Sequence, residues 1–163
     1  MNIIIKKKQL IYKGNIFKCS IGKAGLTNNK KEGDLKTPKG LFKLGALYFR
    51  KDRINFLKSK IRNKEIKKNM GWCDDIKSKK YNTQIKFPIK YNAEKLYRRD
   101  SLYNILIHIK YNNSPIVKNK GSAIFLHICT KNYSGTHGCI AIKKKDLLKI
   151  IPLIKKNTKI LIK

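Results

Sequence analysis

The chain has 163 residues and a formal net charge of +31, because 40 lysine and arginine residues outnumber 9 aspartate and glutamate residues. This length suits one domain, residues 1–163, with a core that needs neither disulfides nor a metal ion. No apolar run approaches the ~18 residues of a membrane span, and the four cysteines lack the spacing of a small disulfide-bonded scaffold.

The positive charge has two interpretations. Lysines occur from Lys6 to Lys163 rather than in one block, which favours a solvated surface over a basic substrate groove. Nucleic acid is the less expected partner, since aromatic residues such as Tyr97 and Tyr103 form no recognisable single-strand-binding motif. A module that binds nucleic acid or another polyanion is the alternative to an enzyme.

The first residues predict short strands rather than an export signal. Residues 3–5 are apolar and precede three lysines, which reverses the order of a signal peptide and is too short for its hydrophobic part. Alternating and β-branched residues predict strands at 2–5, 9–12 and 16–21, which begin as a hairpin and include a turn at Lys13-Gly14-Asn15.

A polar loop is expected at 27–36. The following Thr37-Pro38-Lys39-Gly40 predicts a turn, because Pro38 restricts φ and Gly40 permits positive φ. Residues 41–49 are then a strand candidate.

The middle of the chain is less regular. Residues 51–70 are basic with scattered apolar positions, so we expect an irregular segment with at most a short helix. Asp74 and Asp75 form the only close acidic pair and follow the sole tryptophan, Trp72. They are interpreted either as turn-capping residues beside a core tryptophan or as a wall of a substrate cleft that orients a cationic amine. Trp72, Asp74 and Tyr81 would belong to that wall.

The second half is expected to contain more strand than helix. One or two helical turns are predicted at 92–100, and a strand is predicted at 102–111, with His108 as a structural residue in it. A helix is predicted at 145–154, and it is expected to end or kink before Pro152. A last strand is predicted at 158–162. No βαβ rhythm or repeat is visible. The sequence therefore predicts a mainly antiparallel β domain with a few short helices.

One stretch, residues 121–142, combines a candidate nucleophile with candidate bases. A buried strand is predicted at 122–129 with His127 near its end, and a loop at 133–138 leads to Cys139. We expect this position to expose the thiol, whose thiolate form is the nucleophile. Spacing alone favours His137 as its base, because alternate residues of an extended chain share a side.

Two alternatives compete with the nucleophile. Cys139 could be a small buried hydrophobic residue, as free cysteines often are. The pairs His127-x-Cys129 and His137-x-Cys139 could also bind zinc, although no CxxC spacing supports this and no metal is expected.

The order His127, loop, Thr136-His137-Gly138-Cys139 resembles the active-site signature of the L,D-transpeptidases with the YkuD-type catalytic domain. Residues 33–42, which contain Thr-Pro-Lys-Gly-Leu-Phe, resemble the second marker of that family. The loop of eleven residues between His127 and Cys139 is short for the family, and Ala141 replaces a common arginine or asparagine. The short loop and Gly71-Trp72-Cys73-Asp74-Asp75 resemble a small subgroup without the usual export signal.

The resemblance implies a YkuD-type β-sandwich and a mechanism without cofactors. Cys139 would attack a peptidoglycan stem tetrapeptide, with His127 as the base and His137 beside the cleft. The backbone N–H groups around Gly138 and Cys139 would bind the oxyanion, and Thr136 would be a positioning residue. An amine acceptor would complete L,D-transpeptidation, whereas water would make the same site an L,D-carboxypeptidase or amidase.

The resemblance also bears on inhibitors and location. Carbapenems are expected to acylate Cys139, as they do in the family. The function implies the cell envelope or periplasm, whereas the missing signal peptide leaves the cytoplasm open.

Overall fold

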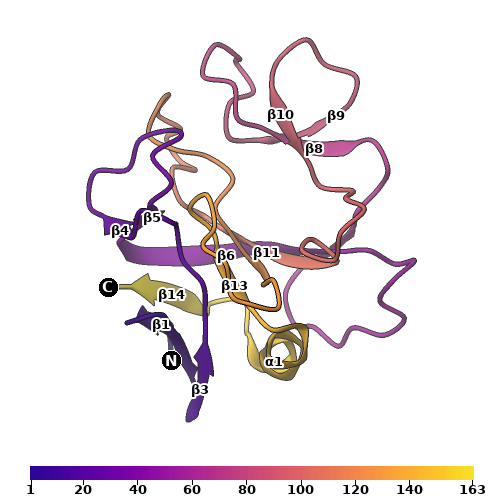
Figure 1. Ribbon diagram of the computed structural model, residues 1–163. Helices are drawn as coiled ribbons and strands as arrows, with labels where there is room; N and C mark the ends of the chain where they lie inside the picture. Colours follow the sequence, from indigo (N-terminus) through magenta and orange to yellow (C-terminus); the bar gives the residue numbers. More distant parts are fainter.

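The computed structural model describes residues 1–163, and a nine-stranded sheet runs through its centre (Figure 1). The sheet order is β13-β12-β11-β6-β14-β1-β2-β3, with β7 paired to β6. Its strands are β1 (Ile3–Lys6), β2 (Gln9–Tyr12), β3 (Asn15–Lys18), β6 (Gly40–Phe49), β7 (Asn63–Glu65), β11 (Ile105–Ile109), β12 (Phe125–Ile128), β13 (Ile140–Ile142) and β14 (Lys159–Ile162). The predicted mainly β fold with little helix is confirmed.

The two ends of the chain meet in the sheet. β1 and β2 form the predicted hairpin, with Ile5 opposite Leu10, and β1 also pairs in parallel with β14, where Ile3 lies opposite Ile160. The alternation of apolar and polar residues places Ile3, Ile5 and Leu10 on the core side.

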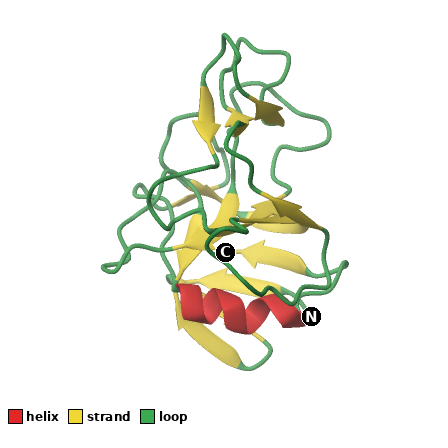
Figure 2. Ribbon diagram, turned by 90° about the vertical axis from the view of Figure 1, so that its right-hand side faces the viewer, coloured by secondary structure: helices red, strands yellow, loops and turns green.

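A helix covers one face of the large sheet. α1 (Lys144–Ile150) continues into the 3-10 helix η1 (Ile151–Leu153), so the predicted helix changes geometry where Pro152 was expected to end or kink it. Leu147, Ile150 and Ile154 pack with sheet residues in the larger of two core clusters. Figure 2 shows this helix on the side of the sheet opposite to a small sheet at the far end of the molecule.

The small sheet has the order β10-β8-β9 and consists of β8 (Met70–Cys73), β9 (Gln84–Lys86) and β10 (Ala93–Lys95). Trp72 of β8 packs against Phe125 of β12 in the second core cluster. β11 lies between the clusters, since Ile105 and Ile107 belong to the first and Leu106 to the second. This strand is therefore buried on both faces rather than alternating between core and solvent.

Two local predictions are wrong. The helical turns predicted at 92–100 are absent, because β10 pairs with β8 and this tertiary pairing overrides a weak helix propensity. The turn predicted at Thr37–Gly40 is extended instead. Thr37 and Pro38 form β5 (Thr37–Pro38), which pairs in parallel with β4 (Leu26–Thr27), and Gly40 opens β6 with a φ of +139°.

Most strand pairs are antiparallel, as predicted, but β12 and β13 are parallel, with His127 opposite Ala141. Parallel neighbours need a connection that returns to the starting end of the sheet. Residues 129–139 make that connection, so Cys139 immediately precedes β13, beside the start of β12.

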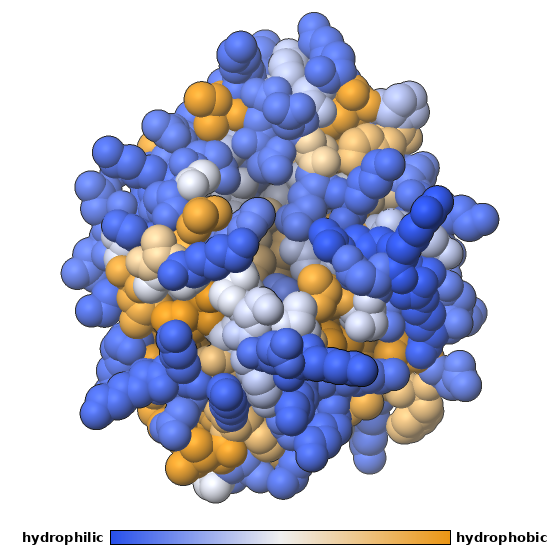
Figure 3. Space-filling view, in the orientation of Figure 1, coloured by the Kyte–Doolittle hydropathy of each residue, from blue (hydrophilic) through white to orange (hydrophobic).

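The surface is lysine-rich. In Figure 3 hydrophilic residues cover most of the visible face, and apolar patches between them are small and separated. No helix of the structure is long and apolar enough to cross a membrane.

Candidate active site

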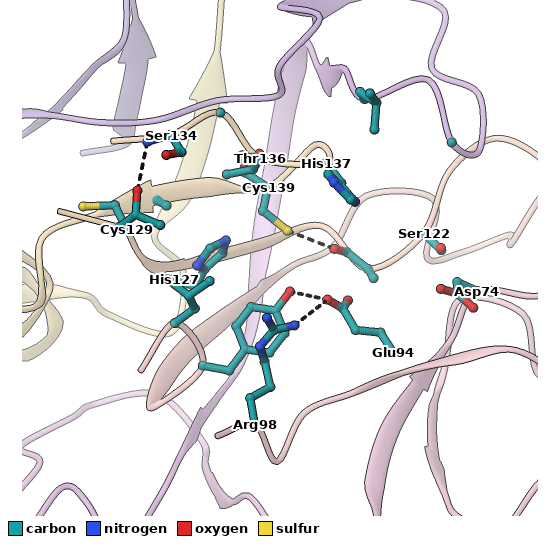
Figure 4. Close-up of a pocket in the computed structure, with 18 of the residues that line it drawn as sticks. Asp74, Glu94, Arg98, Ser122, His127, Cys129, Ser134, Thr136, His137 and Cys139 are labelled. Atoms are coloured by element: carbon teal, nitrogen blue, oxygen red, sulfur yellow. Dashed lines mark hydrogen bonds and ion pairs between the residues drawn. The ribbon is translucent and has the colours of Figure 1, made fainter. Parts of the chain in front are cut away.

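A cavity of about 560 Å³ lies at the end of the β12–β13 connection, and we refer to it as the cleft. Five of the predicted site residues line it together: Asp74, His127, Thr136, His137 and Cys139. Figure 4 shows the Cys139 sulfur between the two imidazole rings. Segments that are distant in sequence, among them Glu32, Asp74 and Glu94, complete the walls.

The Cys139 thiol is held from two sides. The Phe125 N–H donates a hydrogen bond of 3.3 Å to the sulfur, and the thiol donates one of 3.2 Å to the Ala123 carbonyl. The side chain is only 8% exposed, so the prediction of an exposed thiol is wrong. These two hydrogen bonds hold the sulfur beside the start of β12. There it forms part of the cleft wall and does not extend into solvent.

Gly138 is a position that only glycine fits. Its φ is +138°, and a Cβ atom there would lie 2.9 Å from the backbone oxygen of Lys36. Its carbonyl accepts a hydrogen bond of 2.8 Å from the Thr37 hydroxyl, which in turn accepts one of 2.8 Å from the Gly22 N–H. The Thr-Pro marker therefore anchors the residue before the cysteine.

Thr136 fastens the same loop from within. Its hydroxyl donates a hydrogen bond of 2.6 Å to the Cys139 carbonyl and accepts one of 3.1 Å from the Gly138 N–H. The Gly138 N–H is thereby occupied, whereas the Cys139 N–H makes no hydrogen bond within the protein. Of the two N–H groups expected to bind an oxyanion, only that of Cys139 is free.

His127 is buried near the end of β12. Its Nδ1 lies 2.8 Å from the Ile128 carbonyl, which can only accept, so Nδ1 carries the proton and Nε2 is an acceptor. The Tyr103 ring meets the imidazole edge-on, with 5.1 Å between centroids. His137, by contrast, is exposed on the loop and lines the other side of the cleft.

Burial favours the neutral forms of Cys139 and His127. It raises the pKa of Cys139 to about 12, and the charge of Glu94 acts in the same direction. It lowers the pKa of His127 to about 4, against the hydrogen bond to Ile128. At neutral pH the cleft thus holds a thiol and a neutral imidazole rather than a thiolate–imidazolium pair.

The cleft is acidic although the chain is strongly basic. Three of the nine acidic residues, Glu32, Asp74 and Glu94, line it, and Arg98 is the only lysine or arginine among the lining residues. Glu94 accepts a hydrogen bond of 2.6 Å from the Tyr103 hydroxyl and lies 3.9 Å from the Arg98 guanidinium. Burial raises the pKa of both Asp74 and Glu94.

Asp74 is the least satisfied of these acids. Its Oδ1 is buried and has no hydrogen-bond partner. An unpaired buried oxygen is costly unless a ligand satisfies it. Sequence reasoning selected Asp74 but missed Glu32 and Glu94. The sequence feature that could have indicated Glu32 and Glu94 is the small number of acidic residues in this basic chain.

Trp72 and Tyr81 stand behind the cleft rather than in it. The Trp72 ring packs edge-on against Phe125 at 5.2 Å, and its indole N–H donates a hydrogen bond of 2.9 Å to Asn82. Tyr81 is buried, and its hydroxyl donates to the carboxylate of Glu32. These two residues therefore support the wall to which Asp74 and Glu32 belong.

All four cysteines are free thiols, and Cys129 also lines the cleft. No group of three or more His, Cys, Asp or Glu side chains is arranged to hold a metal ion. The four residues of the alternative zinc site, His127, Cys129, His137 and Cys139, are thus not gathered around one point.

The protein is mostly β, and a cysteine and two histidines line one cleft. This arrangement is typical of an enzyme that uses a cysteine thiol. The family model described as the L,D-transpeptidase catalytic domain, YkuD, matches residues 2–162, and the chain belongs to this family. No curated protein and no solved structure matches the chain. Membership gives the enzyme class, L,D-transpeptidase, and the kind of substrate, peptidoglycan.

Proposed function

We propose that this protein is an acyl transferase that uses Cys139 to cleave stem tetrapeptides of peptidoglycan. The observation that carries the proposal is the position of the Cys139 sulfur, which lies in the cleft between two imidazole rings and beside a free backbone N–H. The sulfur forms a bond to the carbonyl carbon that follows the L-configured centre. The bond to the terminal D-alanine nitrogen breaks, and a thioester remains on the enzyme.

His127 is the proposed base. Its Nε2 can accept the thiol proton while Nδ1 stays bound to Ile128. Because both groups are neutral at rest, the proton moves as the carbon–sulfur bond forms rather than in a separate earlier step. The same nitrogen then donates this proton to the departing D-alanine amine.

The Cys139 N–H is the proposed oxyanion donor. It makes no hydrogen bond within the protein, whereas the Gly138 N–H is held by Thr136. A donor fixed before the reaction stabilises negative charge without a cost of reorganisation in the transition state. Thr136 and Gly138 are therefore positioning residues for Cys139.

An amine rather than water is the proposed acceptor. The carboxylates of Glu32, Asp74 and Glu94 attract a cationic side chain of a second stem, and the buried Oδ1 of Asp74 has a free acceptor site for it. The bound ammonium first loses one proton to solvent. His127, neutral again after the first step, takes the second proton as the amine nitrogen attacks the thioester carbon, and it returns that proton to the Cys139 sulfur as the carbon–sulfur bond breaks. The envelope is the proposed location, since peptidoglycan lies there.

Product analysis tests this proposal. The protein is incubated with disaccharide tetrapeptides, and the products are identified by mass spectrometry. Crosslinked dimers and free D-alanine are expected with the wild type, and neither with Cys139→Ser. Accumulation of tripeptides without dimers would instead support the L,D-carboxypeptidase alternative.

Asp74→Asn separates the two acceptors. Removal of this carboxylate is expected to shift products from dimers toward tripeptides, because water then competes better with the amine. Asp146→Asn removes the same charge from the first turn of α1 and should leave the product ratio at the wild-type value. An unchanged ratio in Asp74→Asn would contradict the role of Asp74.

A further inference from the structure

A second cavity, of about 1000 Å³, lies apart from the cleft and shares no lining residue with it. We call it the basic pocket. Its walls come from β6, from β7 with the residues before it, from β11 with the residue after it, and from the start of β14 with the turn before it. Seven cationic residues line it: Lys43, Lys60, Arg62, Lys64, Lys110, Lys156 and Lys159.

The number of lysines alone does not define a site, because the chain carries 40 lysine and arginine residues. What distinguishes the basic pocket is that nothing neutralises them. None of the nine acidic residues lines the cavity, and none of its seven cations takes part in an ion pair with an acidic side chain. Like charges thus face each other across a space large enough for a ligand.

The strand register adds to the electrostatic repulsion between these cations. Lys43 of β6 lies directly opposite Lys159 of β14 in the antiparallel pair. Like charges at such positions destabilise a sheet. Lys64 is also half-buried, and burial followed by the charge of Arg62 lowers its pKa. A bound anion would relieve both effects.

His108 supplies an independent observation at the same place. It lines the basic pocket, is only 6% exposed, and its Nε2 is buried without a hydrogen-bond partner. The other ring nitrogen faces Gly45, where a Cβ atom would lie 2.8 Å from Nδ1. A buried imidazole nitrogen with no partner is expected to find one in a ligand.

We propose that the basic pocket binds a small ligand that carries two or more phosphate groups. Several cations around one cavity favour a multivalent anion, and each phosphate monoester carries about −1.5 to −2 charges at neutral pH. The Arg62 guanidinium offers the planar pair of donors that suits phosphate oxygens, and the lysines add point charges. His108 Nε2, when protonated, donates the inner hydrogen bond. The site does not depend on the chemistry proposed for Cys139.

Trp72 offers a direct measurement. It is the sole tryptophan, and its ring centroid lies 4.6 Å from that of His108. Its fluorescence should therefore change when pyrophosphate or a nucleoside diphosphate fills the basic pocket, with saturation at one ligand per chain. Equal affinity for both means that the diphosphate alone is recognised, and tighter binding of the nucleoside means that the organic part is held too. Either result supports the proposal.

Two triple variants that remove the same amount of positive charge distinguish a specific anion site from general attraction of anions to the basic surface. Arg62→Gln/Lys64→Gln/Lys110→Gln is expected to weaken pyrophosphate binding at least tenfold. Lys79→Gln/Lys95→Gln/Lys145→Gln removes three exposed lysines that do not line the basic pocket and should weaken it less than twofold. Equal losses in the two triple variants, a stoichiometry well above one, or equally tight binding of citrate would overturn the proposal.

His108→Phe tests the inner contact. Phenylalanine keeps a ring against Trp72 but removes the nitrogen, so at least a fivefold loss of pyrophosphate affinity at pH 7 is expected, with urea unfolding at pH 7 close to that of the wild type. Wild-type affinity in this variant would contradict the contact. Cys139→Ser should bind pyrophosphate like the wild type, which separates this proposal from the proposed acyl transfer.

Discussion

The Thr37 hydroxyl donates a hydrogen bond of 2.8 Å to the Gly138 carbonyl across 101 residues of sequence. The same oxygen accepts the Gly22 N–H, so one buried side chain ties the β4–β5 segment to the loop that carries Cys139. The two sequence markers of the family are thus parts of one site. The residue before the nucleophile is fixed by a group far from it in the chain.

Thr37→Val should impair both folding stability and acylation. Valine keeps the shape but leaves the Gly22 N–H and the Gly138 carbonyl unpaired, which costs about 1–3 kcal/mol of unfolding free energy. Acylation by a carbapenem should slow about tenfold or more, because a loosened Gly138 misplaces Cys139. Urea unfolding and stopped-flow acylation measure the two effects.

Two further variants serve as controls. Thr37→Ser retains the hydroxyl and should restore most of the rate. Thr83→Val removes only an exposed bond to the Lys80 carbonyl and should change stability by less than about 0.5 kcal/mol. Wild-type acylation in Thr37→Val would show that this bond does not position the nucleophile.

His127→Ala should lose on the order of 10²-fold or more in acylation rate, and His137→Ala clearly less. His127 is buried and its ring is oriented by Ile128, whereas His137 lies on an exposed loop. The active form is the neutral imidazole, and the lowered pKa of about 4 means that it persists as pH falls to 5. Carbapenem acylation by the wild type should accordingly show no loss near pH 6.5.

Acylation rates of both histidine variants from pH 5 to 9 provide the measurement. If His137→Ala is inactive while His127→Ala keeps the wild-type profile, the two roles are reversed.

Glu94→Gln should make the Cys139 thiol more reactive toward iodoacetamide. After burial, the charge of Glu94 is the largest cause of the raised thiol pKa, so its removal should lower that pKa. The midpoint of the pH–alkylation profile should then shift downward. Glu32→Gln neutralises another acid of the cleft and should shift it less. A midpoint that stays constant or rises in Glu94→Gln would refute this electrostatic coupling.

Stability should decrease as pH falls from about 6.5 to about 4. His108 and His127 both have folded-state pKa values of about 4, against 6.5 as the ordinary value. Between these limits the unfolded chain binds protons that the folded chain excludes, so protonation favours unfolding. Each histidine contributes roughly 3 kcal/mol across the full window. The raised pKa values of Asp74 and Glu94 act in the opposite direction.

His108→Phe isolates one of these contributions. Urea unfolding at pH 7 and at pH 4.5 should show a smaller difference between the two pH values in this variant than in the wild type. An identical difference would mean that His108 is not excluded from protonation in the folded state.

Patterns of neighbouring residues predicted those parts of the fold that are determined by residues close together in the sequence. The hairpin of β1 and β2 follows from alternating residues, and Pro152 marks the change from α1 to η1. The local sequence predicts helical turns around β10, because the pairing of this strand with β8 is not encoded in its own three residues. Its conformation depends on a partner elsewhere in the chain.

The sequence predicted which residues form the candidate site, but it did not predict the burial and the charges that surround them. The motif selected His127, His137 and Cys139, which line one cleft. The parallel pairing of β12 and β13, which brings the cysteine beside the start of β12, is a long-range property that periodicity does not report. The burial of the thiol and the nearby Glu94 likewise arise from segments distant in sequence.

Acylation of Cys139 by a stem tetrapeptide is the central claim, and peptide mapping tests it most directly. The protein is mixed with disaccharide tetrapeptide, quenched in acid and digested, and the adduct is located by tandem mass spectrometry. We predict a thioester of the tripeptide on Cys139, with one D-alanine released for each thioester formed in the first turnover. No adduct, or an adduct on Cys19, Cys73 or Cys129 that survives Cys139→Ser, would contradict it.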